Sequence, residues 1–497
     1  LKKALEAGVK PIVVINKVDK PTARVDKVLD EVIDLFIELG ASEEQLDFKV
    51  AYVSALNGTA SLDPDINTQS QSYDDIFKLI IDEIPDPKAD INGDLQFQPA
   101  LLDYNEYVGR IGIGKVHSGT IKVNEMVSCV RLDGSIKQFR IQKLFGFDGL
   151  KRVEINEADA GDIVAIAGLM DISVGETVCN VGKEKALPIL RIDEPTLKMT
   201  FMVNNSPFVG REGKIVTARK IGERLFKETQ KDVSLKVEES GNESWTVSGR
   251  GELHLSILIE NLRREGFELQ VSKPEVIIKE IDGVKCEPYE DVQIEVSDEC
   301  VGNVIEALGL RGGKMDNMSN VNNLIRLNYT IPSRGLIGFN TNFMTLTKGY
   351  GILNHTFKEY LPIEDINSTE RKVGVLVSTE SGKATAYALG QLEDRGQMFI
   401  EPGEDIYEGM IVGQTGRDMD MAGNVVKAKQ QTNTRSSNKD MTVVLKRPII
   451  MTQEQCLEFI NDDELVEVTP NHIRLRKRIL DTVERKKYDA HQKEENN

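Results

Sequence analysis

The sequence predicts a multidomain chain in which one α/β domain is followed by β-rich and α+β domains. Three observations lead to this prediction. Residues 10–56 have the pattern strand, helix, strand, which is typical of a parallel α/β sheet. Residues 95–181 contain short apolar segments separated by turn glycines, without helical periodicity, as in a small β-barrel. Residues 195–361 then repeat the order β-α-β-β-α-β twice.

Size and composition limit the classes of protein that fit. A chain of 497 residues is long enough for about three to five domains. The net charge of −18 predicts a soluble protein without a general cationic coat, so any contact with nucleic acid must use local basic patches. The 5 cysteines include no C-x-x-C and form no even framework, which fits a reducing cytosol. The 5 histidines are scattered without metal-ligand spacing, so no metal site is predicted. No segment has the apolar length of a membrane span.

The clearest chemistry lies in the apolar strand 12–15 and the polar turn that follows it. Ligands of open α/β sheets bind beyond the carboxyl ends of the strands. We expect the Asp19 carboxylate to accept hydrogen bonds from N1–H and N2–H₂ of guanine, a pair of donors that adenine lacks. The Asn16 amide can donate to N7 and brace the loop, and the Lys17 stem can lie along the base. Taken alone, this N-K-x-D pattern also fits a polar turn before a helix.

A second loop supports the guanine interpretation. The apolar strand 48–53 follows a helical pattern over residues 22–39 and ends in Ser-Ala-Leu. A right-handed β-α-β unit places the loops after its two strands side by side, so backbone N–H groups of the second loop can point at O6 of guanine. The two loops together predict a guanine-binding half-site that consists of Asn16, Lys17, Asp19, Ser54, Ala55 and Leu56.

One segment imitates a phosphate-binding loop. Gly109–Lys115 matches G-x-x-x-x-G-K, but Val116 follows where Ser or Thr must bind magnesium, and no helical pattern begins there. The segment also follows the N-K-x-D turn, whereas a GTPase phosphate loop precedes it. We therefore interpret it as a strand and predict no phosphate loop, no metal ligand and no catalytic residue in this chain.

Composition shifts predict five domains and one joint between them. A proline-containing linker ends the first domain, and residues 279–285 form a short joint between the two β-α-β-β-α-β units. We expect residues 1–192 to pack as one unit and the two later units to pivot at this joint. The predicted boundaries are 1–86, 87–192, 193–280, 281–368 and 369–497.

Basic residues concentrate in two places near the C-terminus. The first is a polar loop over residues 424–441, and the second is a segment after Pro470 that we expect to be helical. An acidic protein that docks on RNA must confine its cations to the docking face. The alternatives are a solvated hairpin loop and ordinary surface ion pairs on the helix. The candidate RNA contacts are Lys427, Lys429, Arg435, Lys439, Arg474, Arg476, Lys477 and Arg478.

The order of these parts, with GRGELHLSILIENLRREGFEL beginning at Gly249 and EPYEDVQIEV beginning at Glu287, resembles translational GTPases related to elongation factor G. That factor has a tip domain where this chain has only the joint 279–285. The BipA/TypA and LepA families share this lack. SRGLIGFNTNFMTLTKGYGILNHTF beginning at Ser333 and STESGKATAYALGQLEDRGQ beginning at Ser378 resemble BipA/TypA proteins, and the C-terminal part is unlike that of LepA.

The resemblance implies a partial P-loop GTPase α/β domain, a translation-factor β-barrel, two ferredoxin-like α+β domains and a β-rich C-terminal domain. It further implies a ribosome-stimulated GTPase that uses GTP/GDP and Mg²⁺, with the phosphate loop and magnesium ligands preceding Leu1. Implied partners are the 70S ribosome, ribosomal RNA and A-site tRNA, with roles in ribosome assembly and in stress or cold adaptation, and a monomer off the ribosome. A non-enzymatic ribosome- or RNA-binding fragment and a LepA-like elongation factor stay open as alternatives.

Overall fold

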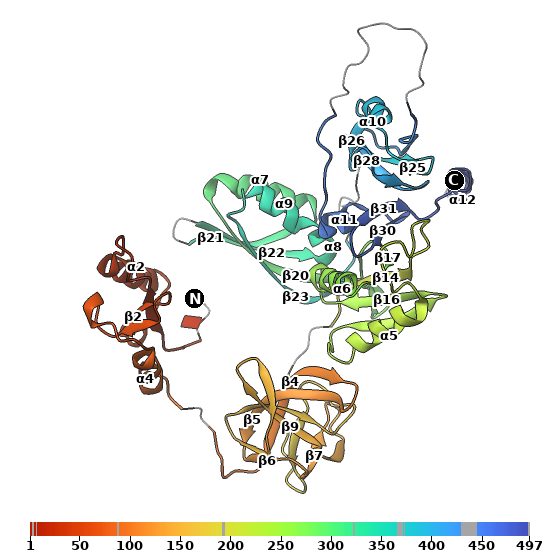
Figure 1. Ribbon diagram of the computed structural model, residues 1–497. Helices are drawn as coiled ribbons and strands as arrows, with labels where there is room; N and C mark the ends of the chain where they lie inside the picture. The colour runs from red at the N-terminus through yellow and green to blue at the C-terminus, as the bar shows by residue number, and fades with distance from the viewer. Residues whose placement is uncertain are drawn as a thin grey trace. The chain divides into compact units, whose positions relative to one another are not determined.

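The computed structural model describes residues 1, 4–5, 7–86, 89–190, 194–321, 324–364, 371, 373–428 and 445–495 (Figure 1). The chain divides into two compact units, Leu1–Asp90 and Ile91–Asn497. The expectation that residues 1–192 pack as one unit is therefore wrong. The boundary between the two compact units lies before the barrel. The barrel residues form a core of their own and belong to the second unit.

The first unit is a small α/β layer whose sheet has the order β1-β2-β3. Strands β1 and β2 are parallel, with Ile12 opposite Lys49 and Asn16 opposite Val53. Helix α2 connects them, and its apolar face packs on the sheet, where the rings of Phe36 and Phe48 lie 5.2 Å apart. The elements are β1 (Ile12–Asn16), α2 (Val25–Glu38), α3 (Glu43–Leu46), β2 (Lys49–Ser54), β3 (Thr59–Ser61), the 3₁₀ turn η1 (Ile66–Thr68) and α4 (Asp74–Glu83).

The second unit begins with a β-barrel-like sheet of order β10-β9-β12-β5-β4-β13-β7-β8. Gly109–Lys115 lies inside β5, so the interpretation of this segment as a strand is confirmed. A Cβ at Gly114 would lie 1.9 Å from the Gln98 carbonyl oxygen, and glycine therefore permits the close approach of β4 to β5. The strands are β4 (Gln96–Asn105), β5 (Gly109–Ser118), β6 (Thr120–Lys122), β7 (Met126–Val130), β8 (Ile136–Arg140), β9 (Lys143–Asp148), β10 (Lys151–Glu154), β11 (Glu157–Asp159), β12 (Ile163–Ala167) and β13 (Thr177–Asn180).

The next part has the predicted order β-α-β-β-α-β, with strands arranged β15-β16-β14-β17. This is the ferredoxin-like arrangement, and the prediction of it is confirmed. Helices α5 and α6 pack on the sheet through Leu225, Leu255 and Ile259, which meet Phe201 and Trp245 in one core. The elements are β14 (Leu197–Val203), α5 (Ala218–Glu228), β15 (Lys236–Gly241), β16 (Ser244–Gly249), α6 (Glu252–Arg264), β17 (Leu269–Val271) and β18 (Glu275–Val276).

Two strands from the end of the chain complete this sheet. Strand β30 (Glu464–Val468) pairs antiparallel with β17, and β31 (Ile473–Lys477) pairs with β30. The helix predicted after Pro470 is therefore wrong for residues 473–477, which form a strand, whereas residues 482–495 further along the same basic segment are helical. Lys and Arg favour helices locally, but Val466 and Val468 of β30 offer Leu475 and Ile473 buried partners, and this pairing overrides local propensity.

A second ferredoxin-like part follows, with strand order β21-β22-β20-β23, so this predicted repeat is also confirmed. Its core joins Ile294, Leu327 and Phe343 with residues of α7. The joint 279–285 is itself a hairpin, because β19 pairs with the beginning of β20. The elements are β19 (Lys279–Ile281), β20 (Val284–Val296), α7 (Asp298–Leu310), β21 (Lys314–Val321), β22 (Leu324–Pro332), α8 (Ser333–Leu336), α9 (Phe339–Leu346) and β23 (Ile352–Pro362).

The C-terminal part adds a small sheet of order β26-β28-β24-β29. Val375 and Ile411 of this sheet and Leu457 of α11 belong to the core of the first ferredoxin-like part, so the two share one interior. No helix in the described ranges is long and apolar enough to cross a membrane. The elements are β24 (Val375–Ser378), β25 (Gly382–Lys383), α10 (Ala386–Leu392), β26 (Gly396–Met398), β27 (Asp405–Ile406), β28 (Ile411–Thr415), β29 (Met421–Gly423), α11 (Gln453–Phe459) and α12 (Thr482–Glu495).

A buried carboxylate holds the loop between β14 and α5. Glu268 is 0% exposed and accepts hydrogen bonds from the backbone N–H groups of Gly210 at 2.7 Å and Glu212 at 3.0 Å. It also accepts one from Gly213, where any Cβ would meet the Glu268 side chain at 2.4 Å. The charge of Glu268 is thus compensated by backbone dipoles, which is the condition for burying a carboxylate.

We expect Glu268→Gln to destabilise the second unit by about 2–4 kcal/mol, because one amide oxygen cannot replace a carboxylate that accepts three N–H groups. Thermal unfolding of the whole chain measures the effect. The control Glu223→Gln removes an exposed carboxylate paired with Arg219 on α5 and is expected to change stability by less than about 1 kcal/mol. Equal melting temperatures for Glu268→Gln and the unchanged chain would contradict this role of Glu268.

Candidate nucleotide and RNA contact sites

The predicted guanine half-site lies where β1 and β2 end. Asn16 is the last residue of β1 and Ser54 the last of β2, and parallel pairing makes both loops leave the same edge of the sheet. The Asn16 Oδ1 atom accepts hydrogen bonds from the N–H of Lys17 at 2.7 Å and from the N–H of Ala55 at 3.1 Å. One amide side chain therefore ties the two loops together.

The turn after Asn16 leaves a carboxylate available. Lys17 has a left-handed backbone with φ 66°, held by its bond to Asn16 and by the hydrogen bond that Lys20 N donates to the Lys17 carbonyl. Val18 is buried, and its N–H donates to the Val53 carbonyl at 3.3 Å. Asp19 is half-buried, and within the described part of the chain its carboxylate makes no hydrogen bond or ion pair. Its oxygens are thus open to a ligand.

The second loop is only partly open. Ser54 is 1% exposed, and its Oγ accepts a hydrogen bond from the N–H of Asn57. The N–H of Ala55 is bonded to Asn16 and is not available to O6 of a base, whereas Leu56 lies beyond it with 88% of its surface exposed. A cavity of about 370 Å³ beside β1 includes Asn16 and Lys17 but not Asp19 or the second loop. The half-site is therefore an open pair of turns.

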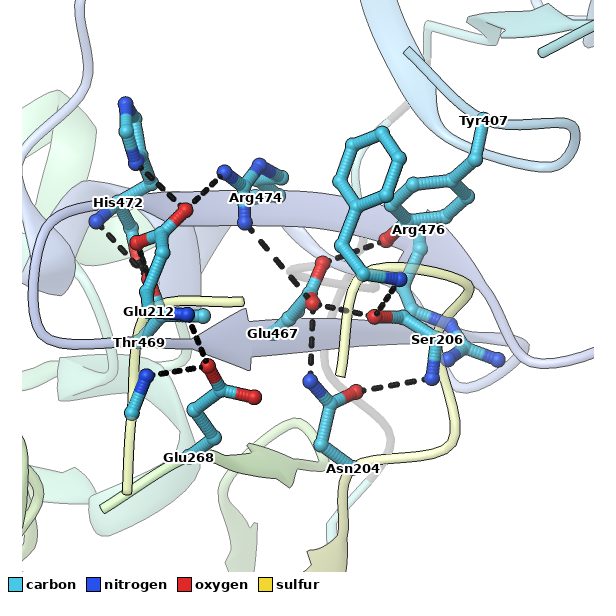
Figure 2. A network of polar contacts seen from close by, with 12 residues as sticks. Asn204, Ser206, Glu212, Glu268, Tyr407, Glu467, Thr469, His472, Arg474 and Arg476 are labelled. Atoms are coloured by element: carbon cyan, nitrogen blue, oxygen red, sulfur yellow. Dashed lines mark hydrogen bonds and ion pairs between the residues drawn. The ribbon is translucent and has the colours of Figure 1, made fainter. Parts of the chain in front are cut away.

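Two of the candidate RNA contacts, Arg474 and Arg476, lie at a buried polar network (Figure 2). Glu467 of β30 is 0% exposed and accepts hydrogen bonds from Asn204 Nδ2 at 2.9 Å, Tyr407 Oη at 2.7 Å and Ser206 Oγ. Burial, together with the neighbouring Glu467 charge, raises the pKa of Tyr407 well above its usual range, so its hydroxyl remains a donor.

Arg474 lies between the carboxylates of Glu212 and Glu467 (Figure 2). Its Nη2 donates to Glu212 Oε1 at 2.6 Å, and its Nη1 lies 3.9 Å from Glu467. Glu212 also accepts hydrogen bonds from Thr469 Oγ1 at 2.6 Å and from His472 Nδ1 at 2.9 Å. Burial alone would raise the pKa of Glu212, but these three hydrogen bonds and the Arg474 charge lower it to about 2.

The neighbouring cations of β31 are internal as well. Arg476 is 1% exposed, and its Nη1 donates to Asn205 Oδ1 at 2.7 Å. Lys477 is 2% exposed, with its Nζ 2.6 Å from Asp420, 2.6 Å from Asp463 and 2.9 Å from Glu464. These three carboxylates have the spacing of a metal site, but the Lys477 ammonium occupies their centre.

The structure therefore removes Arg474, Arg476 and Lys477 from the candidate RNA contacts, because carboxylates and backbone inside the protein already hold their charges. Arg478 remains exposed, and among the described residues its side chain donates to the Asp462 carbonyl, at 3.2 Å. A local sequence pattern could not reveal the difference, since the partner residues come from other parts of the chain.

Lys427 stays a candidate. Its backbone is fixed by a hydrogen bond from its N–H to Asn424 Oδ1 and by one from Thr385 Oγ1 to its carbonyl, while its side chain is exposed. Three other candidates, Lys429, Arg435 and Lys439, lie outside the described residues. Lys446 and Arg447, which are exposed, were not among the RNA contacts predicted from the sequence, because the predicted loop ends at residue 441. Their place directly after the basic loop is a signal that could have included them.

An N-K-x-D turn braced against a second loop, followed by a β-barrel and two ferredoxin-like domains, defines a guanine-nucleotide-binding protein of the translation-factor class. Family models support this class along most of the chain. Residues 1–86 match the elongation factor Tu GTP binding domain, 109–179 match elongation factor Tu domain 2, 284–370 match the elongation factor G C-terminus, and 373–482 match the TypA/BipA C-terminal domain.

Curated relatives specify the family. The chain is 60% identical over 489 residues to a Bacillus subtilis protein named large ribosomal subunit assembly factor BipA, covering 98% of this chain and 80% of the relative. Proteins of the same name from Escherichia coli K12 and Salmonella typhimurium are 50% and 49% identical, covering 98% and 99% of this chain and 80% and 81% of those relatives. The chain therefore belongs to the BipA/TypA family of translational GTPases, and the resemblance inferred from the sequence is confirmed.

The low pKa of Glu212 predicts a pH dependence of stability. A carboxylate whose pKa is depressed in the folded state stabilises that state above its ordinary pKa, and this stabilisation is lost as the pH falls toward the folded value. We expect Glu212→Gln to lower the melting temperature at neutral pH, and the difference from the unchanged chain to shrink as the pH falls from about 5 to about 2.

Thermal unfolding of both proteins over a pH series measures this difference. The control Glu157→Gln removes an exposed carboxylate that forms an exposed ion pair with Lys122, and it is expected to change the melting temperature little at any pH. A difference between Glu212→Gln and the unchanged chain that stayed constant across the acid range would show that the Glu212 charge does not stabilise the fold.

Proposed function

We propose that this chain acts in the cytoplasm as a ribosome-associated GTPase in assembly of the large ribosomal subunit, the process that the names of its relatives indicate. The observation that carries the GTPase part of the proposal is the Asn16 bridge, which holds the Asp19 turn and the Ala55 loop together with the Asp19 carboxylate unoccupied. Roles in stress or cold adaptation belong to the same proposal and come from the family resemblance.

The chemistry assigned to the site is recognition of the base. GTP hydrolysis is the attack of water on the γ-phosphate, and its catalysis rests on positioning and on neutralising the phosphate charges. The nucleotide contacts that we assign are Asn16, Lys17 and Asp19 with the 54–56 loop, and all of them are contacts to guanine. Mg²⁺, when bound with GTP, would help to neutralise the phosphate charges. The one acidic trio with metal spacing in the described ranges does not fit it, since Lys477 fills that trio.

The partners that we propose are ribosomal RNA and the acceptor region of A-site tRNA, contacted by a protein that is a monomer off the 70S ribosome. Support comes from charge. The net charge of the chain is −18, yet the segment 424–441 carries four cations and one carboxylate, Asp440. Backbone phosphates attract such a segment without any reading of bases. The proposed RNA contacts are Lys427, Lys429, Arg435, Lys439 and Arg478.

We retain the five predicted domain boundaries as a proposal, with one modification. The strands β30 and β31 come from the segment 369–497 but belong to the sheet of the segment 193–280. We expect these two segments to behave as one rigid body, because separating them would break a sheet and expose its core.

The guanine assignment predicts a change of nucleotide preference. In a chimaera that joins the N-terminal segment of the Bacillus subtilis relative to this chain, we expect ribosome-stimulated GTP hydrolysis. Asp19→Asn in the chimaera should favour XTP over GTP, because an amide donates a hydrogen bond where the carboxylate accepted one. Phosphate release with each nucleotide measures this preference.

Two comparisons make this test specific. The chain without the added segment serves as the negative control and is expected to show background turnover. Asp26→Asn, a carboxylate on the first turn of α2 to which we assign no base contact, is the matched control and should leave the preference for GTP unchanged. If Asp19→Asn still preferred GTP to XTP, Asp19 would have no role in selecting the base.

The RNA assignment predicts a change in salt dependence. We expect the triple substitution Lys427→Ala, Lys429→Ala and Arg435→Ala to weaken ribosome binding and to flatten its dependence on salt, because each lost phosphate contact removes about one released counterion. Sedimentation with ribosomes across a salt series measures the slope, and circular dichroism verifies the fold. An unchanged slope in a folded triple variant would mean that the loop does not contact RNA.

A further inference from the structure

A groove of about 470 Å³ opens on the small C-terminal sheet, away from the residues assigned so far. Its cationic side chains are Arg395, at the turn between α10 and β26, and the adjacent pair Lys446 and Arg447. All three residues are exposed, and none makes an ion pair or a side-chain hydrogen bond with the residues that the structure describes. The groove therefore brings together three cations that have no carboxylate partner among the described residues.

Two carboxylates, Glu393 and Asp394, also line the groove. Glu393 accepts a hydrogen bond from the Lys446 N–H at 2.7 Å, so its charge fixes the wall of the groove and is bonded to backbone. Asp394 lies exposed beside Arg395 without an ion pair to any cation in the described ranges. Other exposed lysines do form an ion pair with a carboxylate, as Lys137 does with Asp171 at 3.0 Å.

The groove is built on ordered backbone. The segment after residue 444 runs beside β26, where the Ile449 N–H donates to the Met398 carbonyl at 2.9 Å. Gly396 is required at the beginning of β26, because a Cβ there would lie 2.0 Å from the Gln414 carbonyl oxygen. At Gly416 an added Cβ would meet no described atom within 4 Å, so the space beside this glycine is open with respect to the described residues. The backbone that carries the three cations is therefore held in place by contacts within the protein.

The lining indicates the class of ligand. Besides the three cations it comprises Glu393, Asp394, Gly396, Gln397, Met398 and Gly416, without an aromatic side chain on which a base could stack. Recognition of single-stranded bases normally uses such stacking. Point charges without stacking or base-reading groups suit the phosphates of a nucleic-acid backbone.

We propose that the groove formed by Arg395, Lys446 and Arg447 seats the phosphodiester backbone of RNA. In sequence, Lys446 and Arg447 follow the cationic segment 424–441 and are separated from it by residues 442–445. The inference rests on the proposed RNA contact of the C-terminal part and assigns a second, preformed contact to it. The basic loop and the groove would then engage successive phosphates of one RNA.

The test uses the whole chain and a short fluorescein-labelled RNA duplex of arbitrary sequence, with binding followed by fluorescence anisotropy over a salt series. We expect Arg395→Ala, Lys446→Ala and Arg447→Ala together to weaken binding roughly tenfold at low salt and to reduce the slope of log K against log salt by about 2. Arg395→Lys with Arg447→Lys keeps the charges and is expected to keep the slope. This variant also protects the test if the alanine variant fails to fold.

The matched control removes three cations that already have carboxylate partners, Lys137, Lys183 and Lys358. It changes the net charge equally and is expected to alter the slope by less than about 1. An equal effect of this control would attribute the loss to net charge and overturn the proposal.

The remaining outcomes separate the groove from the loop. If the loop variant at 427, 429 and 435 weakened binding but the groove variant did not, the groove proposal would fail and the proposed RNA contact would stand. If neither variant weakened binding, both would fail. Loss of poly-glutamate binding with RNA binding intact would identify an acidic protein as the occupant, and full displacement of RNA by millimolar inorganic phosphate would indicate a small-anion site; either result would overturn the proposal.

Discussion

The pairing of β30 with β17 is the constraint on which much of the second unit depends. It joins residues far apart in sequence into one sheet and places Glu464 and Glu467, both 0% exposed, inside the protein. A buried carboxylate is tolerated only where donors or cations compensate it. The polar network of Asn204, Ser206, Tyr407 and Arg474 is therefore a consequence of the pairing, and it locks the loop after β14 onto the C-terminal hairpin.

This network also determines which cations remain for a partner. Lys477 balances three carboxylates, and Arg474 lies between two. In a chain of net charge −18, each cation used inside leaves one fewer for nucleic acid. Lys427 and Arg395 are exposed and make no ion pair with the described residues, so their charges remain available. The distribution of free cations, rather than their number in the sequence, indicates where RNA would bind.

The first unit follows a different logic, in which recognition of the base depends on a single side chain. The Asn16 amide oxygen bonds both loops, and the Asp19 carboxylate has no hydrogen-bond or ion-pair partner among the described residues. An acceptor that is held in place but unoccupied loses little conformational freedom when it binds a ligand. The nucleotide contacts that we assign in this unit are contacts to the base.

The sequence by itself determined the features that local patterns encode. The N-K-x-D turn, the strand character of Gly109–Lys115 and both β-α-β-β-α-β orders could be predicted, because each depends on residues close together in the chain. The tertiary structure was needed to show that residues 473–477 form a strand, that Arg476 and Lys477 are buried, and that the barrel belongs to the second compact unit. These features depend on partners distant in sequence, and the free energy gained by burying apolar surface and pairing charges with such partners exceeds the local preference of the segment.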